Sequence, residues 1–427
     1  MSQWPDSLWR ATALPADPNP ALDGDLTCDV TVIGAGFTGL RAALKLAEAG
    51  ASVAVLEAGD VGYGASGRTG GQVNPMLPFN GPEEVCKRVG AGYFERLTAA
   101  SLGSADALFA LLRRYQIDCQ ARQNGWLRVD HALKAAKVAR AAAESWNRHG
   151  ATIQMVEGED LARLTGTRAY RTGTLIPQGG AVQPLSLARG LARVAKGAGA
   201  RVFGGSPVTT LRQDPSGWLA QTPGGAVRSS WVILATNGHT DGLWSGLRNS
   251  LLPLIPIQIA TDPLDPDQIG AILPRGHTIS DTRRVIMYAR REPDDRIVFG
   301  GLGRVGWDGR ITGHDWLIRD VARIFPALAG VKWPFRWGGR IALTDDRLPH
   351  LHEPAKGLLA GLGYNGRGVA MAHVMGEALA NRALGVPPEN LPFPTTQIRR
   401  IPFRNLQLMG ARTAVWWMRM RDRSEVG

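Results

Sequence analysis

Three closely spaced glycines and one downstream acidic residue form the strongest chemical signal in this sequence. Gly34, Gly36 and Gly39 follow an apolar run, and Glu57 closes the next apolar run. Such glycines permit a tight turn, let the backbone approach a pyrophosphate and let a helix pack closely on its strand, while an acid about 20 residues further on binds ribose hydroxyls. The spacing therefore predicts a dinucleotide site.

Two further stretches contain glycine at suggestive spacing. Segment 62–72, GYGASGRTGGQ, offers bare backbone amides that can continue along the same ligand, with Arg68 near the far end. A second glycine pattern, at positions 301, 303 and 306, lacks both a helix opening and a following strand with a terminal acid, so it predicts the end of a hairpin. A single dinucleotide site argues against a reductase that holds FAD and NAD(P)H together.

The elements that must position these residues follow from hydrophobic periodicity. Residues 28–59 predict a strand, a glycine turn, a helix and a buried strand, and residues 93–115 and 131–150 have helical spacing. Residues 251–261 and 285–301 have the composition of strands. A chain of 427 residues with 44% hydrophobic content can form one large domain or two intimately packed domains.

Composition argues against several classes of protein. The three cysteines, Cys28, Cys86 and Cys119, have none of the spacings of a zinc site or a redox pair, so no metal is expected. No apolar run is long enough to span a bilayer and the first residues lack the features of a signal peptide, so we expect a cytoplasmic protein. The net charge of +12 comes from arginines spread along the chain, which favours a solvated basic surface over a nucleic-acid site.

Eight stretches spread over nearly the whole chain carry a family resemblance. They are CDVTVIGAGFTGL, VLEAG, GYGASGRTGGQ, AVQPLSLARGLA, WVILATNGHT, YARREPDDRIVFGG, WGGRIALTDDRLPHL and GLGYNGRGVAMA. Together they resemble the FAD-dependent amine and amino-acid oxidoreductases of the glycine oxidase and D-amino-acid oxidase type, and most closely their gamma-glutamylputrescine oxidase branch.

The resemblance implies a mixed α/β fold in which a Rossmann-like FAD-binding domain is interleaved with a substrate domain built on a large, mainly antiparallel sheet. The implied FAD-binding pieces are 25–90, 175–245 and 340–385; the substrate domain is 91–174 and 246–339; and a basic tail helix occupies 386–427.

The resemblance also places residues along the cofactor. The glycine-serine-arginine loop passes the pyrophosphate and flavin, one strand meets the adenine edge, and a helix amino terminus faces the pyrimidine side, where negative charge builds on reduction. Covalent attachment in sarcosine oxidases uses a cysteine of the carboxy-terminal half, and all three cysteines precede residue 120, so FAD should bind non-covalently. The predicted cofactor residues are Gly34, Gly36, Phe37, Thr38, Gly39, Glu57, Ser66, Arg68, Gly71, Gln72, Val208, Gly366 and Gly368.

Four side chains are predicted to line the substrate side as catalytic candidates: Arg68, Tyr288, Arg290 and Arg340. A guanidinium suits this place because it can bind a substrate carboxylate bidentately. The alternatives are a loop arginine that satisfies backbone carbonyls at position 68 and an ordinary sheet surface at positions 288 and 290, which share one strand face. Structural roles are expected for Trp337, His239 and His373.

The implied reaction is oxidation of a C–N bond in a small amine or amino acid, giving an imine that hydrolyses, with O2 as the acceptor. A membrane-associated dehydrogenase that uses a quinone or protein acceptor is the alternative, because no lysine occurs between Lys196 and Lys332, whereas sarcosine oxidases place a lysine over the flavin. A further alternative is an FAD-binding protein whose basic surface engages RNA or a partner subunit.

The tail has apolar residues among arginines: Leu408, Met409, Trp416, Trp417 and Met420. Their spacing favours a helix that caps the protein's own core. The alternative is a basic amphipathic helix in contact with a membrane, which would suit a quinone-linked dehydrogenase.

Overall fold

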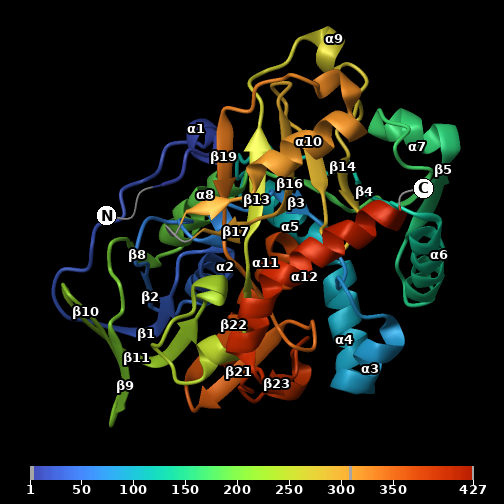
Figure 1. The fold of residues 1–427 in the computed structure, drawn as a ribbon. Helices are drawn as coiled ribbons and strands as arrows, with labels where there is room; N and C mark the ends of the chain where they lie inside the picture. The colour runs from blue at the N-terminus through green and yellow to red at the C-terminus, as the bar shows by residue number, and fades with distance from the viewer. Residues whose placement is uncertain (1–3, 307–309, 426–427) are drawn as a thin grey trace.

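Two large β-sheets organise the chain in the computed structural model, which describes residues 4–306 and 310–425 (Figure 1). The first sheet has a parallel centre in the order β22, β11, β1, β2, β8. Its strands are β1 (Leu26–Ile33), β2 (Val53–Leu56), β8 (Arg201–Phe203), β9 (Thr210–Asp214), β10 (Gly217–Thr222), β11 (Gly225–Leu234), β21 (His350–Ala355), β22 (Leu358–Leu362) and β23 (Thr395–Thr396).

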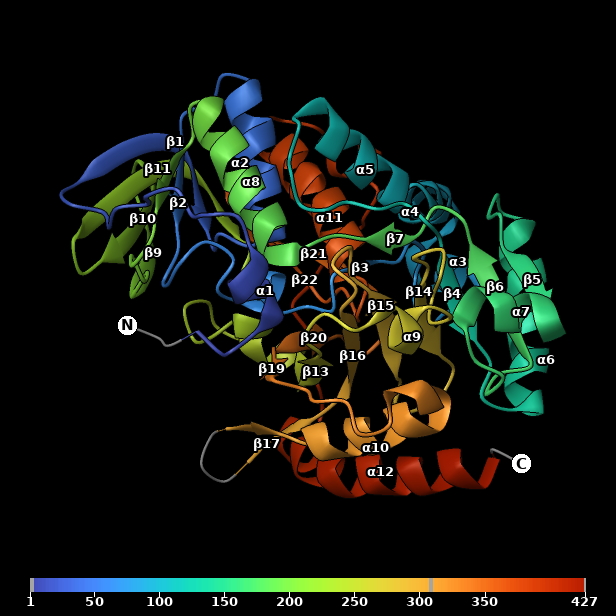
Figure 2. The same cartoon turned by 90° about the horizontal axis from the view of Figure 1, so that it is seen from above.

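Helices cover the parallel centre, as its near-continuous apolar strands require. Figure 2 shows α2 (Phe37–Glu48), α8 (Pro184–Gly197) and α11 (Gly368–Ala383) side by side. Their buried alanines and leucines pack in one core cluster with the apolar residues of β1 and β2. This arrangement brings the amino termini of α2 and α11 to the carboxyl ends of the central strands, where open parallel sheets bind ligands.

The second sheet is mainly antiparallel, in the order β19, β13, β16, β15, β14, β4, β6, β5. Only the β14–β4 pair within it is parallel. Its strands are β4 (Trp126–Val129), β5 (Gln154–Glu157), β6 (Thr172–Ile176), β13 (Pro256–Ala260), β14 (Thr278–Asp281), β15 (Tyr288–Arg291), β16 (Ile297–Leu302) and β19 (Phe335–Gly338).

Shorter elements surround the two sheets. Beside the second sheet, α10 (His314–Ile324) packs on β13 and β16, and α12 (Arg404–Glu425) runs next to α10 (Figure 2). The other helices are α1 (Leu8–Thr12), α3 (Pro82–Val89), α4 (Ala91–Leu102), α5 (Ser104–Arg114), α6 (Leu133–Asn147), α7 (Gly158–Thr165) and α9 (Pro266–Ile269). Three small pairs join β3 (Gln72–Val73) to β7 (Gly180–Ala181), β12 (Leu252–Leu254) to β20 (Ile341–Leu343), and β17 (Arg304–Val305) to β18 (Ile311–Thr312).

The predicted fold class is confirmed, with differences in detail. Residues 93–115 are helical but divide into α4 and α5. The second glycine pattern lies at the end of β16 and on the β17–β18 hairpin, as predicted. Between the predicted helices at 93–115 and 131–150 and just after them, the chain also contains β4, β5 and β6, which were not predicted because short strands with distant partners leave little local pattern. The tail prediction was wrong over 386–403, since the helix begins only at Arg404.

Candidate active site

A cavity of about 790 Å³ is lined by residues of both sheets. The first sheet contributes the glycine turn after β1, the end of β2 and the segment after it, and the turn that begins α11. The second sheet contributes side chains of β4, β14 and β15 and the loop between β14 and β15. The predicted site residues on its wall are Gly34, Gly36, Phe37, Thr38, Glu57, Ser66, Gln72, Val208, Tyr288, Gly366 and Gly368.

The glycine turn leaves no room for larger residues. Gly34 has φ +108°, and a Cβ there would lie 2.9 Å from the carbonyl oxygen of Ala235. A Cβ at Gly39 would lie only 2.0 Å from the carbonyl oxygen of Gly34, so this glycine lets α2 pack directly on the turn. Glycine is therefore required at position 34 because of the backbone conformation and at position 39 because of the contact with backbone.

Glu57 supports the turn from the end of β2. Its Oε2 accepts a hydrogen bond from the backbone N–H of Ala35 at 2.8 Å, and its Oε1 accepts one from Gly59 at 2.9 Å. Burial raises the pKa of Glu57, and the two backbone donors oppose that shift. The carboxylate thus fixes the turn while it lines the cavity.

The glycine-rich segment after β2 lies directly against the turn. The Oγ of Ser66 accepts a hydrogen bond from the backbone N–H of Phe37 at 3.0 Å, and a Cβ at Gly36 would lie 2.9 Å from that oxygen. The N–H of Gly62 donates to the carbonyl oxygen of Ala35 at 3.0 Å. Because its glycines have no side chains, this segment can pack closely on the glycine turn. The same glycines allow its backbone to approach a ligand.

Two long helices begin at the cavity wall without a side-chain cap. The N-cap of α2 is Gly36 and the N-cap of α11 is Arg367, and neither side chain accepts from its own helix. The Oγ1 of Thr38 and the hydroxyl of Tyr364 lie 2.5 Å apart and join the two helix starts. The N–H of Phe37, the first of α2, is taken by Ser66, but no side chain of the N-cap residue takes the N–H groups that follow. These groups are open to an anion, so this wall fits the diphosphate and flavin ends of a dinucleotide.

Tyr288 is the predicted substrate-side residue that reaches the cavity. Its hydroxyl accepts a hydrogen bond from Nε2 of Gln258 at 2.6 Å, and burial raises the pKa of the phenol. Gly70 and Gly300 make room for its ring, because a Cβ at either position would lie within 2.7 Å of Cε2. Nearby, Nε2 of Gln72 donates to backbone carbonyls of the second sheet and joins that sheet to the glycine-rich segment.

Arg290 requires a correction. Although it shares a strand face with Tyr288, it is 1% exposed and does not line the cavity. Its Nε and Nη2 donate to Glu292, and Nη1 donates to the carbonyl oxygens of Gly71 at 2.8 Å and Val182 at 2.7 Å. Gly71 belongs to this packing, since a Cβ there would lie 2.3 Å from Nη1. The guanidinium holds the glycine-rich segment in place and has no donor group facing a substrate.

Arg68 and Arg340 also lie away from the cavity wall. The Nε of Arg68 donates to the carbonyl oxygen of Tyr63 at 2.9 Å, and its guanidinium stacks 4.3 Å from the Tyr63 ring centre. This is the backbone-satisfying role weighed as an alternative above. Arg340 is exposed, and Trp337 is buried with its indole N–H on the carbonyl oxygen of Arg68.

Two arginines that sequence reasoning missed do line the cavity. Arg128 lies on β4 two residues after Trp126, on the same face, and the guanidinium of Arg367 stacks 4.6 Å from the ring centre of Trp126. Burial lowers the pKa of both arginines, and the charge of Arg128 adds to the shift that brings Arg367 to about 9. Within residues 4–306 and 310–425, neither forms an ion pair, and Nε of Arg367 is buried without a hydrogen-bond partner.

The remaining arginines of the cavity wall, Arg283 and Arg284, are neutralised. Arg283 pairs with Asp281 and, at 2.5 Å, with Asp320. Arg284 pairs with Asp422 at 2.9 Å and Glu425 at 2.8 Å. The excess positive charge of the wall therefore lies at Arg128 and Arg367.

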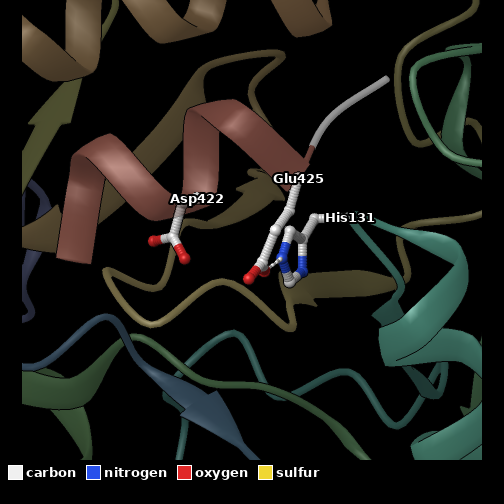
Figure 3. Close-up of side chains that lie close together, drawn as sticks. All are labelled: His131, Asp422 and Glu425. Carbon is white, nitrogen blue, oxygen red and sulfur yellow. Dashed lines mark hydrogen bonds and ion pairs between the residues drawn. The ribbon is translucent and has the colours of Figure 1, made fainter.

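One cluster outside the cavity has the residue types of a metal site. The ligand atoms of His131, Asp422 and Glu425 lie within 4.8 Å of one another, and Figure 3 shows Glu425 beside the His131 ring with Asp422 one turn earlier on α12. The guanidinium of Arg284 donates to both carboxylates, and Nδ1 of His131 lies 2.9 Å from Oγ1 of Thr282. The cluster is thus an ion-pair network around Arg284 that attaches α12 to the loop after β14.

Burial lowers the pKa values of five histidines, and the shift is largest for three of them. His239 lines the cavity, His352 and His373 are buried, and burial lowers their pKa values to about 4, about 4 and about 3. Within the described chain, neither ring nitrogen of His373 has a hydrogen-bond partner, which suits a neutral ring stacked on Phe37.

These histidines predict a loss of stability in mild acid. An unfolded histidine takes up a proton near pH 6.5, whereas these stay neutral, so the free energy of unfolding should fall as the pH drops from about 6.5 toward 4. Each such group can contribute up to about 1.4 kcal/mol per pH unit. Urea unfolding at pH 7 and pH 5 measures how the free energy of unfolding changes with pH. The variant His373→Leu should reduce this change by up to the contribution of one titrating group. An unchanged slope would contradict the assignment for His373.

The tail helix α12 has an inner and an outer face. Val415 and Met418 pack against the core of the second sheet, while Trp417 and Met420 are 50% and 49% exposed. Leu408 is half-buried; the side chains of Met409 and Trp416, also named in the sequence analysis, lie outside the described residues. None of the helices in the described chain is long and apolar enough to cross a bilayer.

Comparison with known proteins agrees with this arrangement. A family model described as DAO, FAD dependent oxidoreductase, matches residues 29–382. Gamma-glutamylputrescine oxidoreductase of Escherichia coli (strain K12) is 30% identical, over 94% of this chain and 96% of that protein. Glycine oxidase of Geobacillus kaustophilus is 24% identical, over 84% of this chain and 92% of that protein.

Solved structures share the fold. The crystal structure of glycine oxidase from Geobacillus kaustophilus superposes with a TM-score of 0.74 at 22% identity, over 87% of this chain and 99% of that one. L-proline dehydrogenase from P.horikoshii superposes with a TM-score of 0.69 at 19% identity, over 87% and 98%.

Proposed function

This chain belongs to the DAO family of FAD-dependent oxidoreductases, and we propose that it oxidises a C–N bond in a small amine that carries a carboxylate. Bound FAD would accept the hydride equivalent from the carbon beside the nitrogen. The cofactor would be held by the glycine turn, Glu57, Ser66, Val208 and the start of α11, all of which line one cavity. The imine product would be released and hydrolyse in water.

The observation that carries the substrate class is the unpaired arginine pair. Arg128 and Arg367 lie near Trp126 in the cavity wall, burial lowers the pKa of both, and within the described chain neither forms an ion pair. Two neighbouring guanidiniums repel each other, so an anion that binds between them relieves the repulsion and satisfies their donors. A carboxylate accepts bidentate hydrogen bonds from such a fork.

The amine end of the substrate would lie in the less polar part of the cavity. A free alkylamine is mostly protonated at neutral pH, with a pKa near ~10.4, and must lose that proton before it gives up a hydride. Ile286 and Leu302 are apolar residues of the cavity wall, and a poorly solvated environment favours the neutral amine. Tyr288, held by Gln258, would orient the substrate as a neutral hydrogen-bonding group.

Matched pairs of substrates test the proposal. Each amino acid or carboxylated amine of a panel is compared with its amide, in which the charge is absent and the shape is kept. We expect turnover with O2 to release a carbonyl product and hydrogen peroxide in equal amounts, with kcat/KM at least tenfold higher for the carboxylate. Equal kcat/KM for acid and amide would contradict the role of Arg128 and Arg367, and carbonyl product without peroxide would exclude O2 as the acceptor.

A second candidate differs in the electron acceptor. The outer side of α12 and the residue before it expose Phe403, Leu406, Trp417 and Met420 to solvent. Residues 398–421 contain six arginines and no acidic residue. An apolar stripe with basic flanks is typical of helices that lie on anionic membranes, so this surface favours a dehydrogenase that passes electrons to a membrane quinone.

Vesicle flotation separates the two candidates. The membrane candidate predicts binding to vesicles that contain phosphatidylserine, weaker binding to phosphatidylcholine alone, and loss of binding in the double variant Trp417→Ser, Met420→Ser. It also predicts that a soluble quinone analogue supports faster turnover than O2. Absence of the protein from the floated phosphatidylserine fraction would contradict this candidate.

A further inference from the structure

Two carboxylates hold the loop between β14 and β15. One lies at the start of the loop and the other on the last helix of the chain. Asp281, at the end of β14, accepts a hydrogen bond from the backbone N–H of Met287 at 3.0 Å. Asp422 accepts from the N–H of Arg284 at 3.2 Å through Oδ1 and from the N–H of Val285 at 3.0 Å through Oδ2. Two consecutive backbone donors in the middle of this loop are therefore satisfied by one side chain of the last helix.

The backbone of this loop determines the position of the cavity wall. Thr282, Arg283, Arg284 and Ile286 line the cavity, whereas Val285 and Met287 belong to the core of the second sheet. Residues 284 to 287 therefore contribute in turn to the cavity wall and to the core. A shift of the amides at 284 and 285 would therefore move cavity-lining side chains on both sides of them.

The attachment of α12 is buried and has several points of contact. Asp422 is 4% exposed, and its Oδ1 also accepts from Nη1 of Arg284 at 2.9 Å. Glu425, one turn later, accepts from both terminal nitrogens of Arg284 at 2.8 and 2.9 Å. On the preceding turn, the guanidinium of Arg419 stacks 4.3 Å from Trp316 and donates to the carbonyl oxygen of Leu302, which also lines the cavity.

We propose that α12 positions the substrate side of the cavity and that Asp422 is the positioning residue. No described residue of α12 lines the cavity itself, so its influence passes through the 282–287 loop. The glycine turn and the start of α11 belong to the other sheet, so removal of the Asp422 carboxylate should affect substrate binding and leave FAD binding unchanged. The kinetic part of this inference rests on the proposed function, whereas the structural part does not.

Hydrogen exchange and kinetics of Asp422→Ala test the inference together. The matched control is Asp267→Ala, which removes an exposed aspartate of α9. We expect the amides of residues 284 and 285 to exchange about tenfold faster or more in Asp422→Ala and at the wild-type rate in the control. KM should rise about tenfold with little change in kcat or FAD content, and Asp422→Asn, which keeps one acceptor oxygen, should fall between the two.

The two arms distinguish the possible failures. Unchanged exchange at 284 and 285 in Asp422→Ala and Asp422→Asn would overturn the inference whatever the enzyme does. Faster exchange with an unchanged KM and a lower Tm would also overturn it, because Asp422 would then serve stability alone. If the wild-type protein oxidises none of the amines offered, the proposed function fails, and faster exchange in the two variants would still support the positioning of the loop.

Discussion

Substitution of Arg128 by glutamine is expected to lower kcat/KM for a carboxylate-bearing amine about 100-fold while the FAD content stays unchanged. A charge-assisted hydrogen bond contributes about 1.5–3 kcal/mol, and the upper part of that range corresponds to roughly a 100-fold change. Arg128 has no ion pair within the described residues, and the nearby buried carboxylate of Asp130, which its charge stabilises, keeps its hydrogen bond from Thr172 when Arg128 is replaced. The effect should therefore appear mainly in KM, as the loss of an interaction common to the ground state and the transition state.

The controls for this prediction use other arginines and another substrate. Arg113→Gln removes an exposed arginine outside the cavity and should leave kcat/KM unchanged. Arg367→Gln should resemble Arg128→Gln, because both arginines line the cavity and the charge of Arg128 acts on Arg367. For the amide analogue, both variants should retain the wild-type kcat/KM or exceed it. An equal loss for acid and amide would show that Arg128 supports the fold of the wall and does not bind the carboxylate.

Substitution of Gly39 by alanine is expected to remove FAD from the purified protein. The added Cβ would lie 2.0 Å from a backbone oxygen, that of Gly34, and 3.0 Å from Cγ1 of Val32. Because the contact is with a backbone oxygen, no side-chain rotation can relieve it, so the start of α2 must shift away from the turn. The dissociation constant for FAD should rise 100-fold or more, a cost of about 3 kcal/mol, measured by titration of the apoprotein with FAD fluorescence as the signal.

The matched control for this change is Gly197→Ala. Gly197 ends α8 at the surface, and a Cβ there would meet no atom within 4 Å. The control should bind FAD as the wild type does and show a slightly higher Tm, since alanine has the better helix propensity. Wild-type FAD affinity in Gly39→Ala would contradict the packing of α2 on the glycine turn.

The local parts of the fold could be predicted from the sequence because their signals are local. The turn at Gly34 and Gly36, the helix after it and the strand just before Glu57 depend on neighbours within 30 residues, and the structure has all of them. The interleaving of two domains came from the resemblance, and it remains a proposal. The strands of the first sheet come from 26–56, 201–234 and 350–396, which fits that proposal except that β23 lies beyond residue 385.

The substrate side could not be predicted, because it depends on strand register and on which carboxylates are nearby. Tyr288 and Arg290 share a strand face, yet Arg290 donates to the carbonyl oxygens of Gly71 and Val182 and so does not reach the cavity. Arg128 lies on a four-residue strand whose partner β14 is about 150 residues away in the sequence, and local composition does not reveal that pairing. In the same way, the sequence around Asp422 shows only an acid in a basic tail. Its hydrogen bonds to the amides of a distant loop depend on the tertiary fold.

Anaerobic reduction of the bound flavin tests the central claim most directly. The purified holoenzyme is mixed without oxygen with a panel of amines and amino acids that includes gamma-glutamylputrescine, sarcosine, proline, pipecolate and glycine, and the flavin absorbance is followed. The account predicts that at least one carboxylate-bearing compound bleaches the flavin, that its amide does so much more slowly, and that Arg128→Gln slows the bleaching at low substrate concentration. A flavin that stays oxidised with every compound, or that is bleached equally by acids and their amides, would contradict the account.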